Sequence, residues 1–350
     1  MTKQRYAVAA LVGAFLIWGV LGCDDTPGPQ GPPGPSGAES CLGCHGDTPG
    51  GSTANLSAIA SEYETSIHAT GETFVRRDAE CSGCHSNEGF IQRVDTGAFP
   101  TAAQPHTSRI DCWTCHAPHT NGNFTVRTEG PVTLVAGGGA VNYGIGNLCI
   151  NCHQARAAIP PVPAGTDSIK LSSRWGPHHG PMGNMLAGKG GFFSSAHPAA
   201  NSGHNTEPSI AAEGCVVCHM HTPPSGGMAG GHSWKMTWDN HGTETDFIEA
   251  CKSCHPSATN FDIDGALTTT AAFLDSVQAR LLGAGLIDSS NLLVTSHYYK
   301  RAEASAVWNY LMVLEDRSTG AHNTAYAQAM LLSALDFVPA PALPPTVAKH

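Results

Sequence analysis

The chain has 350 residues, of which only 13% are charged, while glycine (40) and proline (24) are abundant. This composition favours a loop-rich chain that needs more than an apolar core to hold it together. The formal net charge of -10 argues against a nucleic-acid partner, because phosphate binding needs clustered Lys and Arg.

Residues 1–22 are typical of an export signal. A cationic start, MTKQR, precedes the apolar run YAVAALVGAFLIWGVLG, and the small residue Gly22 stands before Cys23. The layout resembles a bacterial lipoprotein signal, in which Cys23 would become the lipidated first residue. An uncleaved membrane anchor is the alternative, although 17 apolar residues are at the short limit for a span. We expect an exported protein, lipid-anchored at the outer membrane or cell surface or facing the periplasm.

Residues 23–40 form a linker rich in glycine and proline. Glycine recurs at positions 28, 31, 34 and 37 in DDTPGPQGPPGPSGAES, but this collagen-like run is too short for a triple helix. We interpret the linker as a stiff, polyproline-like tether that holds the following domain away from a membrane.

The pattern C-x-x-C-H occurs six times within residues 41–260, and these copies contain 12 of the 13 cysteines. Their cysteines are Cys41, Cys44, Cys81, Cys84, Cys112, Cys115, Cys149, Cys152, Cys215, Cys218, Cys251 and Cys254, followed by His45, His85, His116, His153, His219 and His255. This is the attachment sequence of c-type haem, in which two thiols bond to one porphyrin and the histidine binds its iron. Disulfides or zinc sites are the alternatives, but neither needs a histidine after every second cysteine. We predict six covalently bound c-type haems with these histidines as proximal iron ligands.

The predicted fold class is mostly α with extensive loops and few or no strands, and with haems forming much of the core. Within residues 41–260 we expect short helical turns that carry the motifs. Residues 261–338 have helical periodicity in ALTTTAAFLDSVQARLLGAG, AEASAVWNYLMVLED and NTAYAQAMLLSALDFV. Asp262 and Asp264 are expected to cap the first of these helices, and residues 339–350 to form a Pro-rich tail.

Six proximal histidines leave thirteen of the 19 histidines, enough for a distal ligand at every haem. The chain resembles, over nearly its whole mature length, the multihaem c-type cytochromes of the cytochrome c554, octahaem reductase and pentahaem nitrite reductase group. That resemblance implies distal histidines in CWTCHAPHT (His119), ETSIHATG (His68), RWGPHHGPMGNMLAGKGG (His178, or His179), GGHSWKM (His232) and DRSTGAHNTAYAQAMLL (His322). His204 in NSGHNTEP is a sixth candidate. Weaker candidates are His106, His197, His221, His241 and His297, and the loop methionines Met182, Met185, Met228 and Met236.

The favoured function is electron transfer through mostly bis-histidine haems, as in extracellular electron transfer or anaerobic respiration, with other cytochromes as redox partners. The alternative is a reductase or oxidase of a small nitrogen or sulfur compound, in which one haem stays open. Related nitrite reductases mark that haem with a proximal lysine, and no C-x-x-C-K occurs in this chain. Another branch cross-links a tyrosine to its catalytic haem, for which Tyr298 and Tyr299 are available. A homopolymeric conducting filament is a third possibility, against which the lipid anchor weighs.

Overall fold

The computed structural model describes residues 56–160, 162–222 and 229–340, all of which belong to one structural unit. The predicted signal, Cys23, the tether and the first motif copy (Cys41, Cys44 and His45) lie outside these residues. Met228 and most of the Pro-rich tail lie outside them as well.

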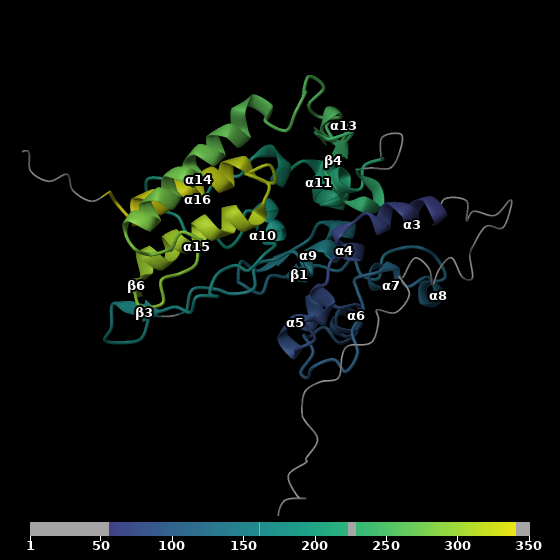
Figure 1. The fold of residues 1–350 in the computed structure, drawn as a ribbon, viewed down its shortest axis with the longest axis horizontal. Coiled ribbons are helices and arrows are strands. Elements are labelled where there is room, and N and C mark those ends of the chain that lie inside the picture. The colour runs from purple at the N-terminus through teal and green to yellow at the C-terminus, as the bar shows by residue number, and fades with distance from the viewer. Residues whose placement is uncertain (1–55, 161, 223–228, 341–350) are drawn as a thin grey trace, which may run out of the picture. The chain divides into compact units, whose positions relative to one another are not determined.

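Short helices joined by loops make up most of the described chain (Figure 1). The helices before the C-terminal part are α3 (Leu56–Glu64), α4 (Ile67–Thr70), η1 (Thr73–Val75), α5 (Ala79–His85), α6 (Asn87–Thr96), α7 (Cys112–Cys115), α8 (Pro118–Asn121), η2 (Gly144–Gly146), α9 (Asn147–Ile150), α10 (Met182–Ala187), η3 (Gly203–Asn205), α11 (Pro208–Glu213), α12 (Val216–His219), η4 (Gly231–Ser233), α13 (Glu249–Lys252) and η5 (Ile263–Gly265). The predicted fold class, mostly α with extensive loops, is therefore confirmed.

The strands of the described residues are short and form three two-stranded antiparallel sheets. These pair β1 (Val132–Thr133) with β2 (Ala140–Val141), β3 (Ser168–Lys170) with β6 (Tyr298–Lys300), and β4 (Thr237–Asn240) with β5 (Thr243–Asp246). Only the β3–β6 sheet joins segments that are far apart in the sequence, with Ile169 opposite Tyr299. The sheets thus fix local turns and one long-range connection.

Each of the five described motifs includes a single helical turn, as predicted. The amide of His116 donates to the carbonyl of Cys112 at 2.8 Å, and the amide of His153 donates to that of Cys149 at 2.9 Å. In α7 a capping box closes the turn, because Asp111 accepts from the Thr114 amide while the Thr114 hydroxyl accepts from the Asp111 amide. Such a turn brings both thiols and the imidazole to one end of a short loop.

Three helices form the C-terminal part and contain the largest apolar core, as their periodicity predicted. They are α14 (Ala266–Gly283), α15 (Arg301–Asp316) and α16 (Thr324–Phe337). Trp308 is 1% exposed, and its Nε1 donates to the carbonyl of Gly190 at 2.8 Å. Asp262 caps α14 by accepting from the amide of Leu267 at 2.8 Å, whereas Asp264 instead turns the chain with a φ of 55°.

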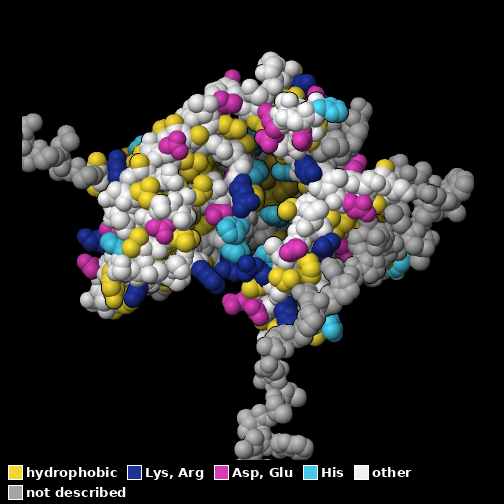
Figure 2. Space-filling model, viewed as in Figure 1, with side chains coloured by type: hydrophobic (Ala, Val, Ile, Leu, Met, Phe, Trp, Pro, Cys, Tyr) yellow, Lys and Arg dark blue, Asp and Glu magenta, His cyan; other side chains and the backbone are white. Residues whose placement is uncertain are grey.

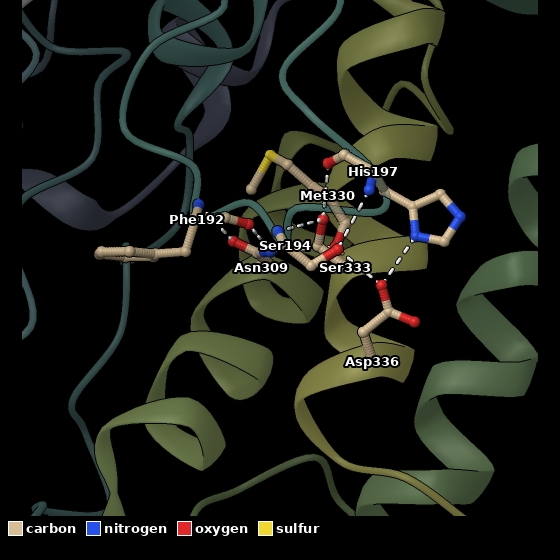
Figure 3. A network of polar contacts seen from close by, with 7 residues as sticks. All are labelled: Phe192, Ser194, His197, Asn309, Met330, Ser333 and Asp336. Atoms are coloured by element: carbon tan, nitrogen blue, oxygen red, sulfur yellow. Dashed lines mark hydrogen bonds and ion pairs between the residues drawn. The ribbon is translucent and has the colours of Figure 1, made fainter.

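The loop that follows α10 is fastened to α15 and α16 by a polar network (Figure 3). The Asn309 side chain accepts from the amide of Phe192 at 2.9 Å and donates to its carbonyl at 2.6 Å. Ser333 donates to the carbonyl of His197 at 3.0 Å, and Asp336 accepts from the His197 ring at 2.8 Å. The long segment between the fourth and fifth motifs is therefore held against the C-terminal helices.

Within the described residues, no helix combines the length and the apolar character that a membrane span requires.

Candidate functional site

Every motif histidine that the structure describes lies beside a second histidine. The ring-centroid separations are 6.0 Å for His85 and His178, 6.4 Å for His116 and His232, 6.1 Å for His153 and His68, 6.2 Å for His219 and His322, and 6.1 Å for His255 and His204. The second member of each pair is one of the histidines that the sequence proposed as a distal ligand. Two of these second histidines, His68 and His204, precede their motif in the sequence, and the other three follow it.

These separations match the space that one metal ion needs between two imidazoles. A metal–nitrogen bond of about 2.0 Å, and a ring nitrogen about 1.15 Å from its centroid, put the two centroids about 6.3 Å apart. The observed values run from 6.0 to 6.4 Å. Two imidazoles supply the axial ligands of a six-coordinate iron, and a porphyrin supplies the four ligands between them. The paired histidines therefore fit a bound haem.

Hydrogen bonds donated by Nδ1 orient several of the paired rings. Nδ1 of His219 lies 2.9 Å from the carbonyl of Trp234, and Nδ1 of His204 lies 2.8 Å from that of Ala321. A proton on Nδ1 leaves Nε2 with a free lone pair, which is the form that binds a metal. These carbonyls thus favour the tautomer whose Nε2 is able to bind a metal.

At His322 the group beside Nδ1 is a carboxylate instead of a backbone carbonyl. Its Nδ1 lies 2.7 Å from Oδ1 of Asp316, which is fully buried. Burial is the largest single influence and acts to lower the pKa of His322, but the Asp316 charge, its hydrogen bond and the Cys215 side chain together raise the pKa. The carboxylate therefore increases the basicity of this imidazole, as a carboxylate that accepts from a metal-bound histidine does.

Burial keeps other paired imidazoles neutral. It lowers the pKa of His153 to about 4 and is the main cause of the lowered pKa of His68. Nδ1 of His68 and Nδ1 of His116 are buried without a hydrogen-bond partner.

Among residues 56–160, 162–222 and 229–340, no group of three or more His, Cys, Asp or Glu side chains comes together that could hold a metal ion.

His178 and His179 have different surroundings. The His178 backbone has a φ of 67°, and its ring faces His85. The His179 side chain is 67% exposed and pairs with Glu315 at 2.7 Å. His119 lies on α8 with its ring edge-to-face on Trp113 at 4.9 Å. The motif histidine that completes the set of six, His45, lies outside the described residues.

Several remaining candidates have other surroundings. His197 and His297 form ion pairs with Asp336 at 2.8 Å and Glu303 at 3.0 Å, and the ring of His221 lies 5.8 Å from that of Phe247. His106 and His241 are exposed.

The candidate methionines also differ in their surroundings. Met182 begins α10, and Met185 is fully buried in the C-terminal core. Met236 packs near Phe247. Tyr298 is 60% exposed, and the buried Tyr299 hydroxyl donates to the carbonyl of Leu286 at 2.6 Å.

The motifs also contact one another through their cysteines. The side chains of Cys84 and Cys152 lie close enough to act on each other, which lowers the pKa of Cys84 and raises that of Cys152. Cys149 and Cys215 do the same, with the pKa of Cys149 lowered and that of Cys215 raised. Gly146 allows the fourth motif to approach the fifth, since a Cβ there would lie 2.8 Å from the carbonyl oxygen of Glu213. The fourth motif thus lies between the second and the fifth.

A buried arginine lies where the second and fourth motifs meet. Arg93 is 8% exposed, with Nη1 3.2 Å from the sulfur of Cys84 and 2.6 Å from the carbonyl oxygen of Asn151. Its guanidinium also lies 4.0 Å from the centroid of the Phe99 ring. No ion pair among the described residues includes Arg93. The sequence did not single it out, because an arginine in a short helix is usually exposed.

No family model matches the chain, and no curated protein matches it. Among solved structures, the crystal structure of the outer cell wall cytochrome OcwA is similar with a TM-score of 0.46 and 22% identity. The match covers 80% of this chain and 50% of that one, so this chain spans about half the length of that protein.

Proposed function

We propose that this chain is an exported hexahaem c-type cytochrome that transfers electrons through mostly bis-histidine haems. The observation that carries the proposal is the pairing of every described motif histidine with a second histidine at 6.0 to 6.4 Å. A haem with two histidine ligands takes up and releases one electron at its iron and leaves no position for a substrate.

The residues divide into attachment and ligation roles. The twelve motif cysteines would form the thioether bonds, and the six motif histidines would be the proximal ligands. The distal ligands would be His178 for the second motif, His232 for the third, His68 for the fourth, His322 for the fifth and His204 for the sixth. His119 is assigned to the first motif, whose residues lie outside those described.

The other side chains orient the ligands and bring the attachment sites close together. The Trp234 and Ala321 carbonyls and the Asp316 carboxylate fix the rings of His219, His204 and His322. The sulfur contacts between motifs keep neighbouring attachment sites adjacent. Short separations favour electron transfer, so packing of this kind supports a carrier.

The enzyme alternative needs a haem without its distal ligand. A second histidine stands beside each of the five described motif histidines, which favours the carrier. The open haem of a reductase would then have to be the one at Cys41 and Cys44. Loss of low-spin character at one haem in the oxidised protein, together with reduction of nitrite or hydroxylamine, would support that alternative.

The proposed location and partners follow from the N-terminus. A lipid on Cys23 would attach the protein to a membrane, and the tether would present the haem domain to soluble or membrane-bound cytochromes. Metabolic labelling with a fatty acid tests this proposal. Label on the wild type that disappears in Cys23→Ser is expected, and a mature protein that retains Met1 would overturn it.

The haem content is tested by mass spectrometry of protein made in a host that attaches c-type haem. We expect an intact mass that corresponds to six covalent haems. A variant in which Cys81 and Cys84 are replaced by alanine, while His85 is kept, should lose one haem. Zinc in place of iron, or disulfides between the motif cysteines, would overturn the proposal.

A further inference from the structure

The surroundings of the His85–His178 pair are cationic, although the chain carries a net charge of -10. Arg76 and Arg156 are both exposed. Both guanidinium charges lie close enough to the His85 and His178 rings to act on them. A guanidinium is always charged in proteins, so this positive field does not depend on pH.

The backbone holds these charges beside the pair. Arg76 ends η1, where its amide donates to the carbonyl of Thr73 at 3.0 Å, and η1 packs against α5, which carries His85. The amide of Arg156 donates to the carbonyl of Pro177 at 3.0 Å, directly before His178. Lys, Arg and His side chains gather on the face shown in Figure 2.

Exposed acids lie on or beside η1 and α5 as well, at Glu72, Asp78 and Glu80. No ion pair among the described residues includes Arg76 or Arg156. The acidic Glu315 lies close by, but it is engaged with His179 at 2.7 Å and Arg317 at 4.0 Å. The two arginines therefore remain available to an external anion.

The surface beside the sixth motif has the opposite charge. A hollow there is lined by Glu244, Asp246 and Glu249, together with Trp238. Of these acids, Asp246 and Glu249 lie close enough to Cys251 to help raise its pKa, after the larger effect of burial. An anionic partner would be attracted to the second motif and repelled from the sixth.

We propose that an acidic redox protein docks over Arg76 and Arg156 and exchanges electrons at the haem held by His85 and His178. This inference rests on the proposed function. Complementary charge steers encounter and raises association rates by about 10- to 1000-fold at low salt. On a chain of net charge -10, such a local positive area determines where an acidic partner can approach.

Two small oxidants of opposite charge probe this surface. Fully reduced, haem-loaded protein is mixed in a stopped-flow instrument with ferricyanide, a trianion, or with hexaammineruthenium(III), a trication. The test variant is Arg76→Glu with Arg156→Glu. The control is Lys170→Glu with Arg301→Glu, which makes the same net change at exposed positions of β3 and α15.

We expect the test variant to be oxidised by ferricyanide about tenfold more slowly than the wild type at low salt, and faster by the cation. The difference should vanish near 1 M salt, where the Debye length is about 3 Å. The control should change either rate by less than about twofold. Equal slowing in both variants would mean that only net charge matters and would overturn the proposal.

Poly-glutamate then distinguishes an acidic protein from a small anion. It should inhibit ferricyanide oxidation of the wild type and not of the test variant. Equal inhibition by phosphate at the same charge concentration would assign the surface to a small anion and overturn the docking proposal. Haem content and visible spectra are measured for every variant, so that a failure of the proposed function is seen separately as missing haem.

Discussion

Arg93→Met removes a buried positive charge that lies between two of the proposed haems. The guanidinium contacts the sulfur of Cys84 at 3.2 Å and the carbonyl oxygen of Asn151 at 2.6 Å. Cys84 precedes His85, and Asn151 lies two positions before His153. The charge is only 8% exposed, so solvent screens it weakly. It should therefore act on the irons bound by both histidines.

The expected effect is a fall in reduction potential, because a nearby cation favours the reduced iron. At a separation of about 10 Å and an effective dielectric constant of about 20, the Coulomb interaction is about 1.7 kcal/mol. A tenfold change in an equilibrium constant is about 1.4 kcal/mol, or about 59 mV for one electron. We predict a fall of about 70 mV for two of the six haems and little change for the other four.

Spectroelectrochemical titration of the haem-loaded protein measures these potentials. Arg93→Lys keeps the charge and should retain most of the wild-type potentials. Arg301→Met removes an exposed charge at the start of α15 and serves as the matched control. An equal fall in the Lys and Met variants would show that hydrogen-bond geometry matters rather than charge, and no fall in the Met variant would refute the reasoning.

Three further substitutions test the ligands and the core. His322→Ala should convert one haem to high spin in electron paramagnetic resonance, whereas His297→Ala should not, because that ring pairs with Glu303 at 3.0 Å. High-spin signal in both would contradict the ligand assignment. Asp316→Asn should raise the potential of the haem held by His322, since it removes the carboxylate 2.7 Å from Nδ1, and an unchanged titration would contradict this role. Trp308→Ala should lower the free energy of unfolding by about 3–5 kcal/mol, because the ring is 1% exposed. Tyr298→Ala, at a side chain that is 60% exposed, should stay within about 0.5 kcal/mol, and equal losses in denaturant titrations would count against the core assignment.

Features that depend on short stretches of chain could be predicted from the sequence. The apolar spacing of the last three helices is local, and the structure has them at Ala266–Gly283, Arg301–Asp316 and Thr324–Phe337. The helical turns of the motifs are also local, because one hydrogen bond spans each turn, such as His116 to Cys112. Their positions needed no knowledge of tertiary packing.

The partner of each motif histidine could not be predicted from the residues. His68 lies beside His153 although two other motifs intervene in the sequence, and His204 lies beside His255 with the fifth motif between them. Such pairing depends on how loops pack, which sequence spacing does not encode. The resemblance to multihaem cytochromes indicated candidate ligands but not which motif each one serves.

Arg93 shows a second limit of sequence reasoning. Nothing in FIQRVDTG distinguishes this arginine from an exposed one. Its burial arises because the second and fourth motifs meet over it and Phe99 covers its guanidinium at 4.0 Å. Both contacts are long-range properties of the fold.

Electron paramagnetic resonance of the oxidised protein, with haem content quantified on the same sample, tests the central claim most directly. The proposed function predicts six haems per chain, all low-spin, because each iron would have two axial ligands from the chain. A high-spin signal equal to one haem per chain, or fewer than six haems, would contradict it.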